Sequence, residues 1–172
     1  ARQDMETFIQ VLIDGLLNGM VYALVAAGLC LIWGVMDVIN FAHGEYLMVA
    51  MYVSYWLGVL AQVDPVVSVL AAGVFIFILG AATYRLIIRY TIGRPGLVAL
   101  LATFGLAMFL RNLCLNRFSP NFLILSDTWL GGKTFQAAGL IFPLPQLVAA
   151  LLALAVVGAI YALINTTRFG WA

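Results

Sequence analysis

Long apolar runs dominate the chain and are separated by short polar breaks. A membrane-spanning helix needs about 20 largely apolar residues, because the hydrocarbon core is about 30 Å thick and each helical residue rises about 1.5 Å. The pattern predicts an all-α integral membrane protein of about five transmembrane helices. We expect them at residues 7–36, 46–62, 66–88, 97–115 and 146–164, with the polar and Gly/Pro-containing segment 116–145 outside the membrane or at its interface.

Composition agrees with this pattern. Apolar residues make up 65% of the chain and charged residues only 9%, and the mean hydropathy is +1.11. A soluble domain carries roughly a quarter charged residues, because its surface must face water. We therefore expect a lipid bilayer as the solvent of this chain. The net charge of +1 provides no basic field for phosphates, so nucleic acid is not an expected partner.

Arginine placement predicts the orientation. Arg85, Arg89 and Arg94 surround the short connector between the third and fourth helices. Positive charge in short loops favours the cytoplasmic side. This places the N-terminus outside and the C-terminus inside, although the opposite side carries a similar number of basic residues, namely Arg2, Arg117 and Lys133.

The first helix has one continuous face of small residues at four-residue steps, namely Gly15, Gly19, Ala23 and Ala27. Such faces allow close backbone approach, which carries much of the packing between helices in lipid. The face predicts either packing against a moving partner helix or ordinary packing within the chain.

Asp14 lies on the same helix, one turn before Asn18. A carboxylate at the bilayer centre costs about 2.5–3.5 kcal/mol on insertion scales and is by default a functional candidate. The first helix is longer than a span requires, however, so Asp14 at the headgroup level is the alternative interpretation.

The segment 37–45 separates two apolar runs. It contains two carboxylates, one amide, the only histidine of the sequence and a glycine, namely Asp37, Glu45, Asn40, His43 and Gly44. Irregular backbone at membrane depth survives only where protein or a water-filled cavity satisfies its polar groups. Transporters use such helix breaks to coordinate substrate or ions. The alternative is a polar turn at the membrane interface. One histidine with one or two carboxylates falls short of a metal-ligand set.

Catalytic and cofactor motifs are not predicted. Gly132-Lys133-Thr134 ends like a phosphate-binding loop, but that motif needs a glycine where Asp127 stands. Cys30 and Cys114 sit inside apolar runs, as small buried hydrophobic residues do. A membrane-embedded enzyme is the least favoured class, since no nucleophile–base or paired-acid arrangement is present at helical spacing.

Several strings resemble one family. Leu17-Asn18-Gly19, Tyr22-Ala23-Leu24-Val25-Ala26 and above all Ile39-Asn40-Phe41-Ala42-His43-Gly44-Glu45 resemble the branched-chain amino acid permease family, the membrane subunits of ABC uptake systems. The stretch 97–115, with Ala102-Thr103-Phe104-Gly105, is similar. Thr167-Arg168-Phe169-Gly170 resembles the entrance to the cytoplasmic coupling segment of these permeases.

The resemblance implies a permease subunit of an ABC importer that moves branched-chain or other hydrophobic amino acids across the bacterial inner membrane. It implies a second permease subunit, two ATPase subunits that bind ATP and Mg, and a periplasmic substrate-binding protein. Permeases of the family continue further, so the chain is expected to be a partial permease that ends before the coupling segment. The alternatives are a permease or channel for urea, amides or another small polar solute, and a non-transporting membrane subunit.

The break and the following helix face are the predicted substrate route. An apolar amino acid needs a mostly apolar wall with a few fixed polar groups. The alternative is that the side chains on the helix face lie in lipid or serve packing alone. The residues predicted to line or gate the route are Asn40, His43, Glu45, Met48, Tyr52 and Tyr55.

Overall fold

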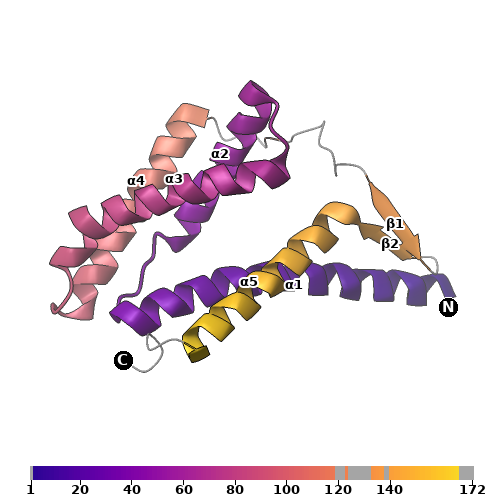
Figure 1. Cartoon of the computed structure of the whole chain (residues 1–172), viewed down its shortest axis with the longest axis horizontal. Helices are drawn as coiled ribbons and strands as arrows, with labels where there is room; N and C mark the ends of the chain where they lie inside the picture. The colour runs from indigo at the N-terminus through magenta and orange to yellow at the C-terminus, as the bar shows by residue number, and fades with distance from the viewer. Residues whose placement is uncertain (1, 119–122, 124–132, 138–139, 167–172) are drawn as a thin grey trace. The chain divides into compact units, whose positions relative to one another are not determined.

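The structure is a computed structural model that describes residues 2–118, 123, 133–137 and 140–166. Each predicted range coincides with a helix, and most ends agree within a few residues. Figure 1 shows the helices and a small hairpin. The elements are α1 (Arg2–Met36), α2 (His43–Ala61), α3 (Pro65–Leu86), η1 (Ile88–Tyr90), α4 (Gly96–Phe118), β1 (Thr134–Ala137), β2 (Leu140–Pro143) and α5 (Leu144–Thr166).

Helix length and composition support the membrane assignment. Among the described residues, four helical segments are long and apolar enough to cross a membrane, namely Met5–Met36, Val66–Tyr90, Gly96–Phe118 and Leu144–Thr166. The protein is therefore an all-α integral membrane protein apart from one hairpin. Helix α2 has 19 residues and is not among the four, because its first turn is polar. That α2 also crosses the membrane stays a prediction.

The hairpin β1–β2 was not predicted. Its strands pair antiparallel, with Phe135 opposite Phe142 and their ring centroids 6.5 Å apart. A backbone bond from Leu144 N to Lys133 O, at 3.0 Å, joins the start of α5 to the base of the hairpin. Strands of four residues are too short for a reliable alternating pattern, which is why hydropathy alone did not reveal them.

The chain forms two compact units, residues 1–28 with 130–172 and residues 29–129. In the first unit, the side-chain amide of Gln10 pairs with the backbone of Ile141 in both directions, at 2.6 and 2.9 Å. The same amide lies 3.2 Å from a carboxylate oxygen of Asp14. Asp14 is thus hydrogen-bonded within its own helix, and no role beyond this bond follows from its contacts.

The small-residue face of α1 is open in this unit. A Cβ atom added at Gly15 or Gly19 would have no neighbour within 4 Å outside the helix itself. Ala23 is exposed and Ala27 is half-buried. Among the described residues, therefore, no close-packed helix covers Gly15 and Gly19, and the packing role of this face stays a prediction.

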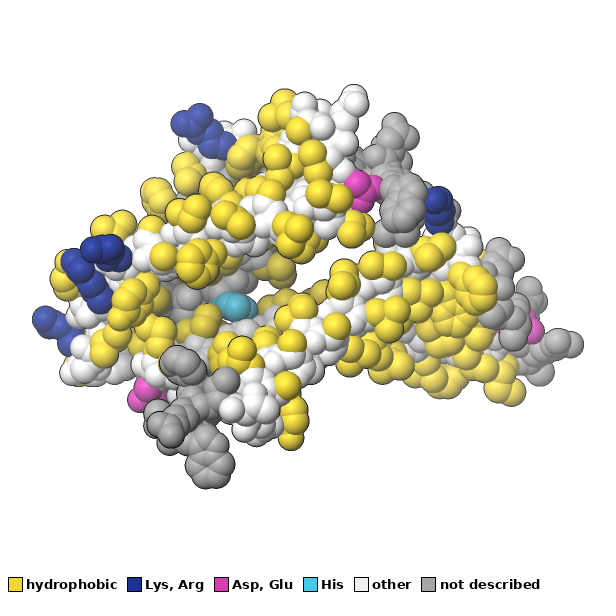
Figure 2. All heavy atoms as spheres, in the orientation of Figure 1, with side chains coloured by type: hydrophobic (Ala, Val, Ile, Leu, Met, Phe, Trp, Pro, Cys, Tyr) yellow, Lys and Arg dark blue, Asp and Glu magenta, His cyan; other side chains and the backbone are white. Residues whose placement is uncertain are grey.

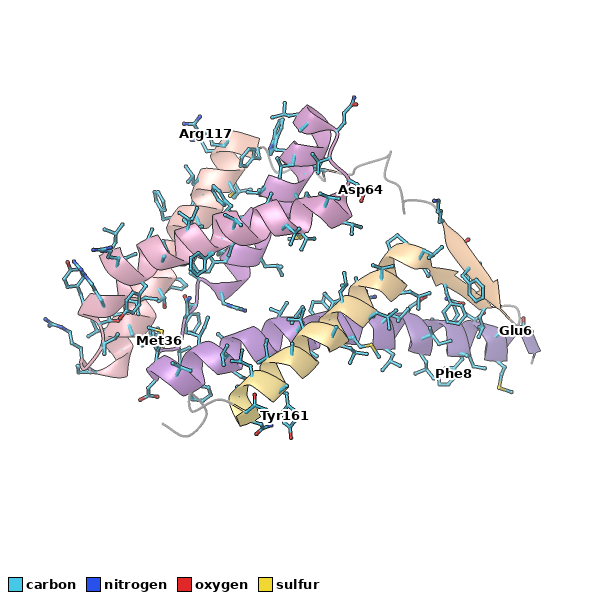
Figure 3. The ribbon with its side chains drawn as sticks, viewed as in Figure 1. Glu6, Phe8, Met36, Asp64, Arg117 and Tyr161 are labelled. Carbon is cyan, nitrogen blue, oxygen red and sulfur yellow. The ribbon has the colours of Figure 1, made fainter. Side chains whose placement is uncertain are left out.

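In the second unit, α2 and α3 form a helical hairpin that also contacts α4 (Figure 1). Gln62 takes a left-handed conformation (φ 51°) after α2, and the Asp64 carboxylate caps α3 by accepting from Val66 N at 2.9 Å. A turn at Asp64-Pro65 therefore separates α2 from α3. Figure 3 shows Asp64 and Arg117 at one end of this unit and Met36 at the other.

The two helices of this hairpin are joined by hydroxyl groups. Tyr46 donates to Thr83 Oγ1 at 2.7 Å, and the hydroxyls of Ser54 and Ser68 are hydrogen-bonded. Such bonds are a principal source of helix association where lipid removes the hydrophobic drive.

Replacing Tyr46 with phenylalanine should remove one of these bonds and lower the stability of the unit by about 0.5–1 kcal/mol. The effect is small because Thr83 keeps its bond to Leu79 O at 2.9 Å. Thermal unfolding in detergent, followed by circular dichroism, measures the change. An unchanged transition would show that the tyrosine hydroxyl does not stabilise the α2–α3 contact.

Candidate functional site

The break between α1 and α2 is built from backbone caps. Asp37 ends α1 in a left-handed conformation (φ 50°), with its N–H bonded to Trp33 O at 2.8 Å. Asn40 is 5% exposed, and its Oδ1 accepts from Ala42 N at 3.0 Å. The Ala42 carbonyl then accepts from Glu45 N and begins α2. Backbone hydrogen bonds and the Asn40 side chain therefore replace the missing helical bonds.

Thr103 of α4 holds the same segment from the side. This residue is 1% exposed, and Phe41 N donates to its hydroxyl oxygen at 3.2 Å. The hydroxyl can itself donate to Ile39 O at 3.3 Å or to carbonyls of its own helix, the nearest being Ala99 O at 2.9 Å. A single side chain thus provides hydrogen-bond partners for part-buried irregular backbone.

The position of Thr103 sets the depth of the break. Thr103 lies seven residues after the start of α4 at Gly96, which is about 10 Å along the helix at 1.5 Å per residue. The extended residues therefore run alongside α4 before α2 begins, and Val38 packs with Ile88 and Ala99 on the way. This geometry places the break alongside the first two turns of α4 and not beyond the end of that helix.

Glu45 and Arg111 form an ion pair between α2 and α4. The Nε and Nη2 atoms of Arg111 donate to Oε1 of Glu45 at 3.1 and 2.6 Å. The Glu45 side chain is 10% exposed and that of Arg111 is 57% exposed. The sequence pattern does not connect these residues, and its one signal is a charged residue inside the largely apolar fourth helix.

The other predicted route residues are distributed along α2. Tyr52 stacks on Phe118 of α4 with ring centroids 4.6 Å apart, and Tyr55 makes an edge contact with Trp56 at 5.7 Å. His43 and Met48 are half-buried. The structure brings Glu45 and Tyr52 to the α4 side of the helix, and Asn40 is buried in the segment just before it. Within the described residues no contact joins Met48 or Tyr55 to them, and the route assignment stays a prediction.

An apolar cavity of about 860 Å³ lies between α2, α3 and α4. Val49 and Tyr52 line it from α2, Leu79 lines it from α3, and Cys114 and Arg117 line it from α4. Its volume falls within the range of about 300–1,000 Å³ that small-molecule sites occupy.

Among the described residues, no three His, Cys, Asp or Glu side chains lie close enough together to hold a metal ion. The described part of the site therefore offers hydrogen bonds, one ion pair and an apolar wall. These groups can bind and guide a solute.

The basic residues gather at the end of the unit where α3 ends and α4 begins. Arg85, Arg89 and Arg94 are exposed there, and Arg89 stacks on the Tyr90 ring 4.4 Å from its centroid. Figure 2 shows the basic side chains at the margins of a largely apolar surface. A membrane protein commonly has this distribution, since charge is expensive inside the bilayer.

Comparison with known proteins identifies the family. A family model described as "Branched-chain amino acid transport system / permease component" matches residues 11–172. The chain belongs to this permease family. The resemblance seen in the Ile-Asn-Phe-Ala-His-Gly string is thereby confirmed, and the chain is a multi-pass membrane protein of a family of transport subunits. Its Thr167–Gly170 string lies inside the matched range but outside the described residues.

The relatives that match the chain are named as permeases of branched-chain amino acid transport systems. The chain is 34% identical over 113 residues to the high-affinity branched-chain amino acid transport system permease protein LivH of Salmonella typhimurium and of Escherichia coli K12. It is 32% identical over 113 residues to the corresponding protein BraD of Pseudomonas aeruginosa. Each alignment covers 61% of this chain, and the chain spans 37% of the length of each relative. No solved structure matches the chain.

Proposed function

We propose that the chain acts as a permease subunit of an ABC importer for branched-chain or other hydrophobic amino acids in the bacterial inner membrane. The family match supports this proposal, together with relatives that are named branched-chain amino acid permeases. In this proposal ATP and Mg bind two separate ATPase subunits. A second permease subunit and a periplasmic substrate-binding protein complete the system. The basic end of α3 and α4 faces the cytoplasm.

The observation that carries a transport role is the break held by Thr103. Its polar backbone lies alongside α4, about 10 Å from the start of that helix. Irregular backbone at such depth is typical of transporter sites, where freed backbone groups and polar side chains meet the solute. The proposed route passes the break residues Asn40 and His43 and follows the face of α2 that continues through Glu45 to Tyr52.

Replacing Asn40 or His43 with alanine should reduce amino-acid uptake roughly 5- to 10-fold, the loss expected from one hydrogen bond to a polar group. Uptake of labelled leucine by cells that carry each variant measures the effect, and the amount of chain in the membrane fraction is determined in parallel. Asn112→Ala is the matched control, because Asn112 is exposed and bonds only within its own helix, to Met108 O at 2.7 Å. Normal uptake by both Asn40→Ala and His43→Ala cells would refute the proposed route.

The energy source separates an importer from a passive channel. Removal of ATP should stop uptake, and an ATPase dimer should copurify with the chain. Uptake of urea or an amide that persists without ATP would instead identify a channel or facilitator.

A further inference from the structure

The Glu45–Arg111 ion pair lies at the edge of the apolar cavity. Glu45 is one helical turn before Val49 on α2, and Arg111 is one turn before Cys114 on α4. Val49 and Cys114 both line the cavity. Residues three or four apart share a helix face, so the pair and the cavity belong to the same side of both helices.

The pair also lies deep along α4. Contacts of Phe41 with Thr103 and of Tyr52 with Phe118 show that α2 and α4 run in the same direction. Glu45 lies four residues after Phe41, and Ala107 lies four residues after Thr103, so Glu45 is level with Ala107. Ala107 is about 16 Å from the start of α4, which is about 34 Å long. A charged group at this depth almost always faces the interior of a bundle or a water-filled path.

Each partner of the ion pair keeps binding capacity. A guanidinium has five N–H donors, and the described contacts of Arg111 use two of them, both on Oε1 of Glu45. Within the described residues, Oε2 of Glu45 accepts no hydrogen bond. The 57% exposure of the Arg111 side chain leaves this group accessible to a solute.

We propose that Glu45 and Arg111 bind the two charges of a free amino acid. Arg111 takes the carboxylate, Glu45 takes the ammonium group, and the apolar side chain enters the cavity beside Val49 and Cys114. This inference rests on the proposed function and adds the groups that recognise the substrate. One ion pair is exchanged for two when the zwitterion enters, so neither charge of the protein is left unpaired. Urea and simple amides lack both charges and cannot make this exchange.

The test uses competition for the binding of labelled leucine to the purified transporter that contains this chain, without the substrate-binding protein. Labelled leucine competes with unlabelled leucine, with isocaproate, which lacks the ammonium group, and with isoamylamine, which lacks the carboxylate. In the wild type, each analogue should compete at least about 10-fold less well than leucine, because a charged partner is left unmatched. An analogue that competes as well as leucine would overturn the proposal without any variant.

Two variants that each remove one charge assign the charges. Glu45→Gln should lower the preference for leucine over isocaproate about 10-fold or more, and Arg111→Gln should do the same for leucine over isoamylamine. Arg85→Gln is the control, because it removes an exposed arginine of α3 that pairs with neither Glu45 nor Arg111 within the described residues. It should leave both preferences unchanged.

A purely structural ion pair gives a different result. Both variants would then reduce leucine binding with unchanged analogue preferences, and the exchanged pair Glu45→Arg with Arg111→Glu would restore binding and its ordinary preferences. Either result would refute zwitterion binding at this pair. The proposed function fails separately, if deletion of the chain leaves ATP-dependent leucine uptake of the wild-type cells unchanged.

Discussion

Replacing Thr103 with valine should destabilise the second unit by about 1–3 kcal/mol and remove most of the proposed amino-acid uptake. Valine has the shape of threonine but no hydroxyl group. Phe41 N–H would lose its acceptor, and Ile39 O would lose the donor that the Thr103 hydroxyl can offer it, both in part-buried hydrogen bonds. Each buried polar group left without a partner costs about 1–3 kcal/mol, and lipid offers no replacement.

The buried thiol of Cys114 provides a readout of this prediction. Cys114 is 5% exposed, whereas Cys30 is exposed, so a Cys30→Ser background leaves one thiol that reacts with a maleimide when the unit opens. The Thr103→Val protein should react at a lower temperature than the parent. Thr103→Ser keeps the hydroxyl and should show a much smaller shift. Thr166→Val removes an exposed hydroxyl that bonds to Ala162 O and should be nearly neutral.

An unchanged reactivity profile for Thr103→Val would show that the bonds to Phe41 and Ile39 do not hold the break. A large loss in Thr103→Ser, equal to that of valine, would point to packing of the Thr103 methyl group instead.

Replacing Ala42 with leucine should destabilise the unit by about 1–3 kcal/mol, the usual cost of added volume in a packed interior. Ala42 is 0% exposed and sits at the first cap of α2, where its N–H bonds to Asn40 and its carbonyl accepts from Glu45 N. A larger side chain must push aside the atoms that bury Ala42 and shift the start of α2. Since Glu45 follows three residues later, the pair with Arg111 should also weaken.

The same thiol readout measures this effect, and leucine uptake should fall in parallel. Ala81→Leu is the matched control, because Ala81 is exposed on α3 and the added atoms would enter lipid. Equal behaviour of Ala42→Leu and Ala81→Leu would mean that the start of α2 adjusts to the larger residue without loss.

The helices could be predicted because each apolar run is close to the length that a bilayer demands. The turn at Asp64-Pro65 was also predictable, since proline disfavours helix in the residue before it. The hairpin β1–β2 was not, because strands of four residues leave little pattern. The first helix begins at Arg2, earlier than its apolar run, because a helix can extend beyond the hydrocarbon.

The candidate site was likewise predictable from the sequence only in part. The sequence by itself determined the break, because five polar or glycine residues between two apolar runs cannot continue a lipid-facing helix unchanged. It also determined the family, through the string that begins at Ile39. Only the tertiary structure decided that Thr103 holds the break and that Arg111 pairs with Glu45. These partners are 62 and 66 residues apart. A local hydropathy pattern records what solvent each residue prefers, whereas hydrogen bonds between distant residues depend on how the helices pack.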